Sequence, residues 1–307
     1  MLKQVLIIQT ASLGDVILST ALAESLHNLY PDLQTDYLIK KGYQGLFEGH
    51  PFIRKVYTFD KSKDKYRNLI QLVSEFRKTR YDAVINVQRF ASSGLITALS
   101  GARHRGGFDK NPFSFAFNHK SRHIIRHTSP TGHEITRNHG LISWIQDIKP
   151  AKPVLYPDPE KAGSNINELF KDQYITISPS SLSFTKQYPA PKWIEFIQAL
   201  PSEIRVVLLG GKDDRELCET ISALSGTRNM KVLAGELNFL MSAYVMKGAV
   251  MNYVNDSAPM HLASSVDAPV TAVFCSTVPE FGFGPLSGNA SVVETQHQLS
   301  CRPCGLH

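Results

Sequence analysis

The strongest constraint on the fold is an alternation of strand and helix patterns that starts near the N-terminus and starts again in the second half of the chain. Residues 4–10 form a continuous apolar, β-branched run, typical of a strand buried on both faces of a parallel sheet. Apolar residues at helical spacing follow over 16–30. This alternation predicts an α/β fold with doubly wound parallel sheets. Further strands are expected at 35–39 and 83–87, further helices at 66–79, 92–99 and 133–148, and an irregular, basic stretch at 101–131.

A proline-spaced segment separates the two halves. Lys149-Pro150-Ala151-Lys152-Pro153 is followed by Pro157 and Pro159, and such a segment cannot continue a helix and forms a stiff connector. The 307 residues suffice for two domains, which we place at 1–150 and 151–307. The second domain is expected to contain strands 174–178, 205–209, 231–233, 249–254 and 270–274, and helices 192–200, 213–224, 239–247 and 259–265. Ligands of such sheets bind outside the carboxyl ends of the strands, so the expected site is a cleft between the domains.

Composition narrows the class of protein. An apolar fraction of 42% excludes a disordered chain, and no apolar run approaches the roughly 18 to 20 residues of a spanning helix. Four scattered cysteines do not form a disulfide framework, which predicts a reducing, cytoplasmic location. Residues 1–150 hold 21 Lys and Arg against 12 Asp and Glu, whereas residues 151–307 hold 12 against 15. An anionic partner should therefore meet the first half.

The first candidate loop places a carboxylate where the first strand gives way to a helix. Ser12-Leu13-Gly14-Asp15 sets Asp15 at the helix N-terminus, where an isolated Asp most often serves only as a cap. The loop lacks both the phosphate-cradling and the dinucleotide-binding glycine patterns. Asp15 is therefore either a cap or a base at the edge of the sheet.

Three loops of the second half could hold a nucleotide diphosphate. Asn255-Asp256-Ser257-Ala258-Pro259-Met260-His261 opens a helix whose free amides suit a diphosphate, although Asp256 competes as an ordinary cap and His261 alone would more often be a packed histidine. Ser178-Pro179-Ser180-Ser181, with Lys186 beyond it, offers hydroxyls and an ammonium group, or is only a solvated loop. The loop 210–216 offers carboxylates for ribose hydroxyls, or caps. Together, the loops predict one domain that holds a nucleotide diphosphate and one that supplies a base.

With these loops in place, the sequence resembles glycosyltransferase family 9, the ADP-heptose:lipopolysaccharide heptosyltransferases. The resemblance implies the GT-B architecture, which has two Rossmann-like domains, and inversion at the anomeric carbon without a required metal or cofactor. The motifs that carry it are Ile8-x-x-x-x-Leu13-Gly14-Asp15, Gly101-Ala102-Arg103-His104-Arg105, His133-Glu134-x-x-Arg137-Asn138, Lys186-x-Tyr188-Pro189-x-x-x-Trp193, Asp256-Ser257-x-Pro259-Met260-His261-Leu262-Ala263 and Phe281-Gly282-Phe283-Gly284-Pro285.

The resemblance also implies residue roles. Asp15 matches the proposed general base, and the second domain supplies the donor site. The acceptor, an anionic lipid-linked oligosaccharide, would meet the basic first domain, which holds a cluster over 54–67 and another over 103–126. The predicted donor-binding residues are Ser180, Ser181, Lys186, Asp214 or Glu216 for the ribose, Asp256, Ser257, Ala258 and His261. The predicted acceptor-binding residues are Ser12, Gly14, Arg103, Arg105 and Arg122.

The expected function is therefore transfer of a heptose or a related sugar from an ADP-sugar to the lipopolysaccharide inner core or a related surface glycan. The alternatives are a sugar-nucleotide epimerase of the same fold and a catalytically idle member that only binds nucleotide. Peripheral contact with the inner face of the inner membrane fits the expected acceptor, and nucleic acid is not an expected partner because no such motif is present. The family usually has Gly and Trp where this chain has Ala258 and Tyr188.

The resemblance also raises a question about the C-terminus. The chain stops at Cys301-Arg302-Pro303-Cys304-Gly305-Leu306-His307, where the family usually continues. Cys301, Cys304 and His307 would supply only three zinc ligands, so we predict no metal site and interpret the cysteines as free thiols or a redox-sensitive pair.

Overall fold

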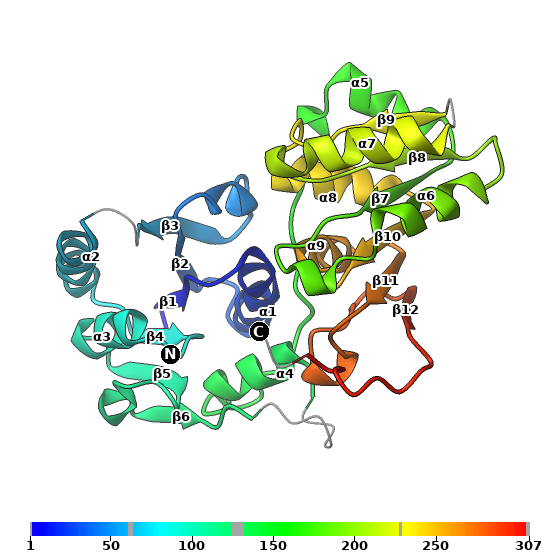
Figure 1. The fold of residues 1–307 in the computed structure, drawn as a ribbon. Coiled ribbons are helices and arrows are strands. Elements are labelled where there is room, and N and C mark those ends of the chain that lie inside the picture. The colour runs from blue at the N-terminus through cyan, green and yellow to red at the C-terminus, as the bar shows by residue number, and fades with distance from the viewer. Residues whose placement is uncertain (1, 61–63, 125–131, 227–228, 305–307) are drawn as a thin grey trace. The chain divides into compact units, whose positions relative to one another are not determined.

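A computed structural model describes residues 2–60, 64–124, 132–226 and 229–304 of the chain. The chain forms two compact units, Met1–Val154 and Leu155–His307, each built around its own parallel sheet. Figure 1 shows both units as sheets flanked by helices. Each unit therefore has the α/β character that the alternating pattern predicts.

The first unit alternates strands and helices from its first strand. Its elements are β1 (Gln4–Gln9), α1 (Leu13–Leu29), β2 (Gln34–Lys40), β3 (Ile53–Phe59), α2 (Lys65–Thr79), β4 (Ala83–Asn86), α3 (Ala91–Leu99), β5 (His104–Phe108), β6 (His119–Ser121) and α4 (Glu134–His139).

The second unit repeats the same scheme. Its elements are α5 (Ser164–Asn167), β7 (Tyr174–Ser178), α6 (Ala190–Gln198), β8 (Arg205–Leu208), α7 (Arg215–Ser225), β9 (Met230–Val232), α8 (Phe239–Gly248), β10 (Met251–Asn255), α9 (Ala258–Ser265), β11 (Val270–Phe274) and β12 (Ala290–Glu294).

The two sheets have the same topology. The first runs in the order β3-β2-β1-β4-β5-β6, and the second runs β12-β11-β10-β7-β8-β9, with every pair of neighbours parallel. Read from its other edge, the second order is β9-β8-β7-β10-β11-β12. When the strands of each unit are numbered along the chain from one to six, both sheets have the Rossmann order 3-2-1-4-5-6. The topological switch points therefore lie between β1 and β4 in the first unit and between β7 and β10 in the second. The predicted pair of Rossmann-like sheets is confirmed.

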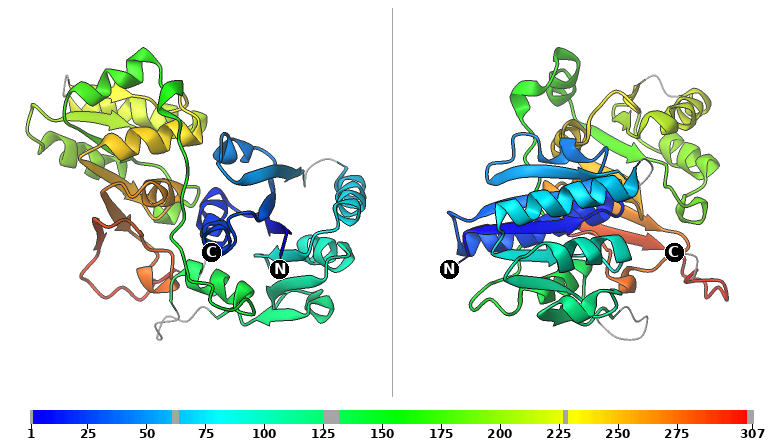
Figure 2. Two further views of the ribbon diagram at one scale, coloured as in Figure 1. Left: turned by 180° about the vertical axis from the view of Figure 1, so that it is seen from behind. Right: turned by 90° about the vertical axis from the view of Figure 1, so that its left-hand side faces the viewer.

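Helices cover both faces of each sheet, as the views in Figure 2 show. In the first unit, Leu6 and Ile8 of β1 pack in one buried cluster with Phe76 of α2 and Ile96 of α3. On the opposite face, the hydroxyl of Tyr37 in β2 donates to the carbonyl of Ser19 in α1 at 2.9 Å. Because alternate residues of a strand point to opposite faces, strands covered twice need nearly continuous apolar runs. The run at residues 4–10 meets that need.

In the second unit the core follows the same rule. Ile175 and Ile177 of β7 pack with Trp193 of α6 and Ile221 of α7 on one face. Tyr174, the residue before Ile175, donates its hydroxyl to the carbonyl of Val245 in α8 at 2.7 Å, on the other face. The sheet is thus held between α6 and α7 on one side and α8 on the other.

Some elements differ from the sequence-based expectation. The predicted helix 133–148 is wrong, because α4 ends at His139 and a short 3-10 helix follows at Gly140–Ile142. Glycine weakens a helix, and a side chain at Gly140 would place its Cβ 2.7 Å from the hydroxyl of Ser121 in β6. The stretch 101–131 is not wholly irregular, since it contains β5 and β6, and β3 and β12 were also not predicted.

The proline-spaced segment is bound to the units that it joins. The backbone N–H of Ala151 donates to the hydroxyl of Ser25, and that of Val154 donates to the hydroxyl of Thr20, both on α1. The next residue, Leu155, donates instead to the carbonyl of Ser265 in the second unit, at 3.1 Å. The units therefore divide between Val154 and Leu155, whereas the sequence placed the boundary after residue 150.

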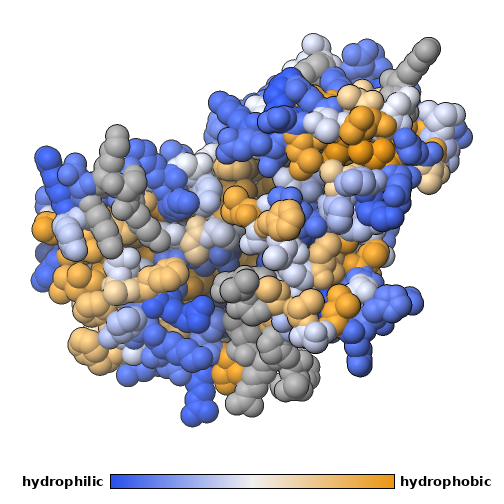
Figure 3. All heavy atoms as spheres, in the orientation of Figure 1, coloured by the Kyte–Doolittle hydropathy of each residue, from blue (hydrophilic) through white to orange (hydrophobic). Residues whose placement is uncertain are grey.

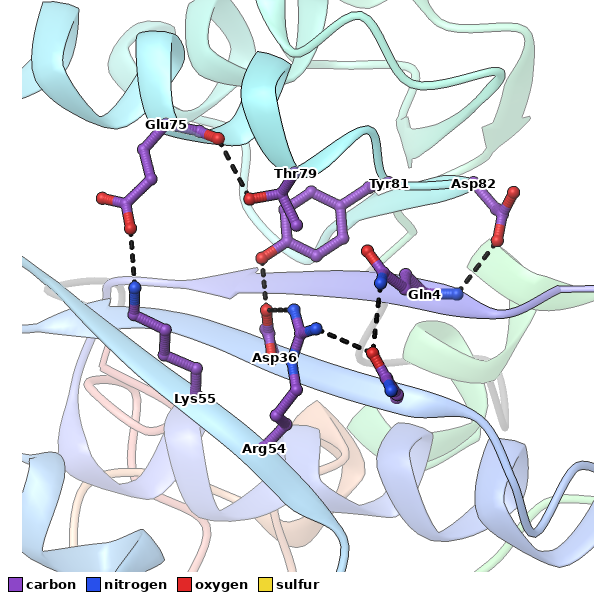
Figure 4. Close-up of polar contacts among 9 residues, drawn as sticks. Gln4, Asp36, Arg54, Lys55, Glu75, Thr79, Tyr81 and Asp82 are labelled. Carbon is purple, nitrogen blue, oxygen red and sulfur yellow. Dashed lines mark hydrogen bonds and ion pairs between the residues drawn. The ribbon is translucent and has the colours of Figure 1, made fainter.

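A buried carboxylate ties together three segments of the first sheet (Figure 4). Asp36 of β2 is fully buried and accepts two hydrogen bonds from Arg54, at 3.0 Å from Nε and 2.6 Å from the terminal nitrogen. The hydroxyl of Tyr81, which precedes β4, also donates to Asp36. Burial, together with the Asp36 hydrogen bond, raises the pKa of Tyr81, which keeps its phenol protonated as a donor. Asp36 is thus a structural anchor of this part of the sheet.

Replacing Arg54 with Met is expected to lower the free energy of unfolding by about 3 kcal/mol, because a buried carboxylate would lose its cation. The control is Lys55→Met in the same strand. Lys55 pairs with Glu75 at 2.6 Å, but the two side chains are 52% and 45% exposed, so about 1 kcal/mol or less should be lost. Urea unfolding followed by circular dichroism measures both. Equal losses for the two variants would contradict the role given to Asp36.

Candidate active site

The predicted loops with Asp15, Ser180 and Asp256 lie at the carboxyl ends of strands that border the two switch points. In the first unit, Asp15 follows β1 and the loop that begins at Val87 follows β4. In the second unit, Ser180 follows β7 and Asp256 follows β10. Ligands of open α/β sheets bind at this position because the connections diverge there and leave a crevice. Each unit therefore presents its candidate residues where its own fold favours binding.

Asp15 is the N3 residue of the capping box of helix α1 and still keeps one carboxylate oxygen unused. Ser12 is the N-cap, and its side chain accepts from the backbone N–H of Asp15 at 3.4 Å. In return, Ser12 donates to Asp15 Oδ2 from its backbone N–H at 3.2 Å and from its hydroxyl at 2.6 Å. Within the described part of the chain, no hydrogen bond engages Asp15 Oδ1. The cap and base interpretations are thus compatible, since the oxygen that holds the loop is not the one available for a proton.

A buried ion pair on α4 lies close to Asp15. Arg137 donates to Glu134 Oε2 from Nε at 2.7 Å and from a terminal nitrogen at 2.6 Å, and the two side chains are 4% and 9% exposed. Burial raises the pKa of Glu134; Arg137 opposes that rise, and the charge of Asp15 adds to it. Both residues belong to the His133-Glu134-x-x-Arg137-Asn138 motif, from which the sequence predicts no individual role for them. The structure brings them to the same edge as the candidate base.

Lys186 and Asp256 form an ion pair beside the second switch point. Lys186 Nζ lies 2.8 Å from Asp256 Oδ2, and the Asp256 side chain is only 7% exposed. The hydroxyl of Thr277 donates to the same Asp256 oxygen at 2.6 Å. Asp256 does not cap α9, because Ser257 occupies the N-cap position. The alternative in which Asp256 is an ordinary cap is therefore wrong.

The start of α9 keeps the features of an anion site. Ser257 makes no side-chain cap hydrogen bond, and Pro259 in the first turn has no N–H to satisfy. The amides of Ser257 and Ala258 are therefore not occupied by a capping side chain. His261 lies further along α9 and is 5% exposed. A diphosphate at this helix start would meet backbone donors and the positive end of the helix dipole.

Asn255 joins the two loops of this switch point. The sequence predicts no individual role for it. It is fully buried, and its Nδ2 donates to the carbonyls of Pro179 and Ser180 at 2.8 and 3.3 Å. Its Oδ1 accepts from the backbone N–H of Tyr188 at 2.9 Å. Ser181 is held in turn by Gln187, whose Nε2 donates to its carbonyl at 2.7 Å. A buried side chain that organises backbone has no signature in one sequence, which is why it was missed.

The two candidate ribose ligands differ in their surroundings. Asp214 Oδ2 accepts from the backbone N–H of Gly211 at 2.7 Å, and so braces the loop after β8. Glu216 is exposed in the first turn of α7. Strand β8 neighbours β7, so both residues belong to the edge that carries Ser180. Asp214 thus has a capping role at this loop, which is one of the two roles that the sequence predicts for it. Ribose binding by Asp214 or Glu216 stays a prediction.

The predicted acceptor residues do not all lie together. Ser12 and Gly14 belong to the Asp15 loop, and Arg122 is exposed just after β6, at the carboxyl edge. Arg103 and Arg105 lie instead at the amino end of β5, since His104 pairs with Ala83 at the start of β4. Parallel strands bring their amino ends to one edge, so the sheet places these two arginines at the edge opposite to Asp15.

Arg105 is also occupied by its own surroundings. It donates to the carbonyls of Ala116 and Ala102 at 2.8 and 2.6 Å, which closes the loop between β5 and β6. The structure therefore gives no support to acceptor binding by this guanidinium. Of the basic clusters expected near the acceptor, Lys61, Lys63 and Arg126 lie outside the described residues.

The two C-terminal cysteines do not form a disulfide in the structure. Cys301 is an exposed free thiol and Cys304 a half-buried one, while His307 lies outside the described residues. No group of three or more His, Cys, Asp or Glu that could hold a metal ion occurs in the part of the chain that the structure describes. Among those same residues, no helix combines the length and the apolar character needed to cross a bilayer.

Comparison with known proteins agrees with this geometry. Residues 69–305 match the family model described as glycosyltransferase family 9 (heptosyltransferase). Lipopolysaccharide heptosyltransferase 3 of Escherichia coli K12 is 26% identical, over 93% of this chain and 88% of the relative. Lipopolysaccharide heptosyltransferase 1 of Pseudomonas aeruginosa is also 26% identical, over 98% of this chain and 86% of the relative.

Solved structures show the same fold. The family 9 glycosyl transferase of Veillonella parvula superposes with a TM-score of 0.81 at 22% identity, covering 95% of this chain and 86% of that one. The ADP-heptose lipopolysaccharide heptosyltransferase II of Escherichia coli gives a TM-score of 0.79 at 20% identity, with coverages of 98% and 95%. The match to the family model spans most of the chain, and the two Rossmann-like sheets are those of the GT-B architecture. The chain belongs to glycosyltransferase family 9 and is a glycosyltransferase.

Proposed function

We propose that the protein transfers a heptose, or a closely related sugar, from an ADP-sugar to the inner core of lipopolysaccharide or a related surface glycan, with inversion at the anomeric carbon. The observation that carries the proposal is the pair of switch points. One holds a carboxylate with an unused oxygen, Asp15, and the other holds a cation, Lys186, beside a helix start without a capping side chain. The named relatives are lipopolysaccharide heptosyltransferases, which supports this donor and acceptor.

In the proposed reaction, Asp15 Oδ1 removes the proton from the acceptor hydroxyl as that oxygen bonds to the anomeric carbon of the donor sugar. The bond between the anomeric carbon and the oxygen of the β-phosphate breaks on the opposite face, and ADP leaves with the negative charge. Ser12 holds the other Asp15 oxygen through two hydrogen bonds, so the carboxylate is already oriented before the acceptor binds.

The leaving diphosphate would be stabilised by Lys186 and by the amides of Ser257 and Ala258. Ser180 and Ser181 line the same edge and are candidates for hydrogen bonds to phosphate oxygens. With these donors the proposed mechanism requires neither a metal nor a cofactor. The ribose is assigned to Asp214 or Glu216, and His261 to the wall of the donor site.

The proposed acceptor is an anionic lipid-linked oligosaccharide, which the excess of basic residues in 1–150 favours. The proposed location is the cytoplasm, with peripheral contact at the inner face of the inner membrane, where such an acceptor would be met. Nucleic acid is not a proposed partner.

The test is a transfer assay with purified protein, ADP-heptose and a lipopolysaccharide core acceptor, followed by mass spectrometry. The expected product is the acceptor enlarged by one heptose, with release of ADP. Conversion of the nucleotide sugar without any acceptor would instead indicate an epimerase. Calorimetric binding of ADP without transfer to any core acceptor would indicate a protein that only binds nucleotide.

A further inference from the structure

We propose that the first unit docks on an anionic lipid membrane through one surface, formed by Arg89, Phe90, Lys110, Phe113 and Phe115. We refer to these five residues as the aromatic-cationic surface. The proposal rests on the proposed function only in the identity of the acceptor, which would be anchored in such a membrane.

The aromatic-cationic surface lies at the edge of the sheet that carries the candidate base. Arg89 and Phe90 follow β4, and Lys110 follows β5. Strand β4 lies between β1, which leads to Asp15, and β5. The charge of Arg89 lowers the pKa of Glu134, and the charge of Asp15 raises it, so both charges lie within electrostatic range of the same carboxyl group. A membrane that met this surface would therefore bring its lipid-linked groups toward the edge where Asp15 lies.

A buried amide holds the two loops of this surface together. Asn111 is 2% exposed, and its Nδ2 donates to the carbonyls of Gln88 and Phe90 at 3.0 and 3.1 Å. Its Oδ1 accepts from the backbone N–H of Phe113 at 2.9 Å. Helix α3 leaves room for this amide only because it has Gly94 there, since a Cβ at that position would lie 2.0 Å from Asn111 Oδ1. The exposed aromatics are thus presented by a rigid support.

Two of the three phenylalanine side chains of this surface are largely exposed to solvent and do not belong to the core. Phe115 is 78% exposed and Phe90 is 57% exposed, and the ring of half-buried Phe113 lies 6.0 Å from that of Phe115. Figure 3 shows apolar residues at the lower left of the molecule, next to hydrophilic ones. Single exposed apolar residues are ordinary, but a group of large ones marks an interaction site.

The charges around these rings select the partner. Arg89 and Lys110 are exposed, and both, with Arg137, add to the effect of burial in lowering the pKa of His123 to about 4, against the opposing charge of Asp109. The local potential is therefore positive. Aromatic side chains that enter the boundary of the acyl chains, flanked by cations that meet anionic headgroups, are the pattern of an interfacial membrane anchor.

The proposal is tested by co-sedimentation with phosphatidylethanolamine vesicles that contain phosphatidylglycerol, and with phosphatidylcholine vesicles. The wild-type protein should bind the anionic vesicles, and binding should weaken as salt is added. The double variant Arg89→Gln/Lys110→Gln should bind about fivefold more weakly for each cation removed. The double variant Phe90→Ser/Phe115→Ser should lose roughly tenfold or more, because two exposed aromatic side chains no longer enter the bilayer.

Matched controls come from the second unit. Leu224→Ser removes an apolar side chain that is 62% exposed on α7, and Lys171→Gln/Lys247→Gln removes two exposed cations. Both should bind vesicles like the wild type. The proposal is overturned if the wild type does not bind anionic vesicles, or if the surface variants bind as tightly as these controls. Circular dichroism should give unchanged melting for Phe90→Ser/Phe115→Ser, because both side chains are exposed.

A second readout separates this proposal from the proposed function. With an acceptor oligosaccharide that has no lipid, Phe90→Ser/Phe115→Ser should transfer sugar at the wild-type rate, while transfer to vesicle-embedded acceptor should fall with vesicle binding. If the wild type transfers no sugar to either the lipid-free or the vesicle-embedded acceptor, the proposed function fails, whatever vesicle binding shows. If transfer to embedded acceptor is unaffected by the two serines, the docking surface is refuted while the enzyme activity stands.

Discussion

Asp15→Asn is expected to lower kcat for sugar transfer by about 10²- to 10⁴-fold, the contribution typical of a general base. Asparagine is nearly isosteric and retains an oxygen that can accept from Ser12, so helix α1 should begin as before. The free energy of unfolding and the affinity for ADP should therefore change little. Stopped-time transfer assays at saturating donor, with calorimetric titration of ADP, measure the two properties separately.

The structural role of Asp15 needs its own control, because one of its carboxylate oxygens completes the capping box of α1 while the other is the proposed base. Asp15→Ala should lose the activity and also about 1 kcal/mol of stability, since the capping box is removed. Asn238→Ala is the matched variant: the Asn238 side chain caps α8 by accepting from the backbone N–H of Met241 at 2.8 Å. It should cost similar stability and leave transfer intact. Unimpaired turnover in Asp15→Asn would remove Asp15 from the mechanism.

Lys186→Gln is expected to lower kcat by about 10²- to 10³-fold, the range found when a donor that stabilises developing negative charge is removed. The difficulty is that Lys186 also neutralises buried Asp256. Among the described residues, loss of the ammonium would leave that carboxylate with the Thr277 hydroxyl as its remaining side-chain partner. Slow transfer by the single variant is therefore compatible with a direct role on the diphosphate and with a purely structural role.

The double variant Lys186→Gln/Asp256→Asn distinguishes these roles. If the ammonium acts on the leaving diphosphate, removing the Asp256 charge does not restore transfer, and kcat stays low. If Lys186 only neutralises Asp256, the double variant recovers stability and most of the rate. Lys192→Gln is the control, because Lys192 pairs at 2.7 Å with Glu195 on the surface, with side chains 52% and 61% exposed. That variant should transfer like the wild type.

The elements that could be predicted from the sequence are those whose burial imposes a pattern. Strands β7 and β11 were expected with the bounds that the structure gives them, Tyr174–Ser178 and Val270–Phe274. Strand β12 was not expected: all five of its residues are exposed, so neither alternation nor a continuous apolar run is required there. Strand β6 is a three-residue strand, His119–Ser121, and is polar throughout.

The site could be predicted in its parts but not in its pairings. The loops with Asp15, Ser180 and Asp256 were located because each follows a strand with a clear pattern. The Lys186–Asp256 ion pair, the bracing of the loops by Asn255, and the approach of Glu134 to the Asp15 edge join residues far apart in the chain. A single sequence carries no signal for such contacts.

Arg103 and Arg105 show the same limit of sequence-based prediction. Arg103 and Arg105 were expected at the acceptor because they are basic and precede a basic stretch. Register alone decides that they begin β5 and so lie at the edge opposite to Asp15. Arg89 and Lys110, at the carboxyl edge, received no individual role from the sequence.

By itself, then, the sequence determined the two-unit α/β organisation, the order of the main strands and the loops that carry the candidate chemistry, because burial on both faces of a parallel sheet imposes apolar runs that are readable along the chain. Only the tertiary structure decided which end of the sheet each charged residue occupies, that Asp256 pairs with Lys186 instead of capping α9, and that one oxygen of Asp15 stays unused. These depend on strand register and on distances between side chains remote in sequence, which local patterns do not encode.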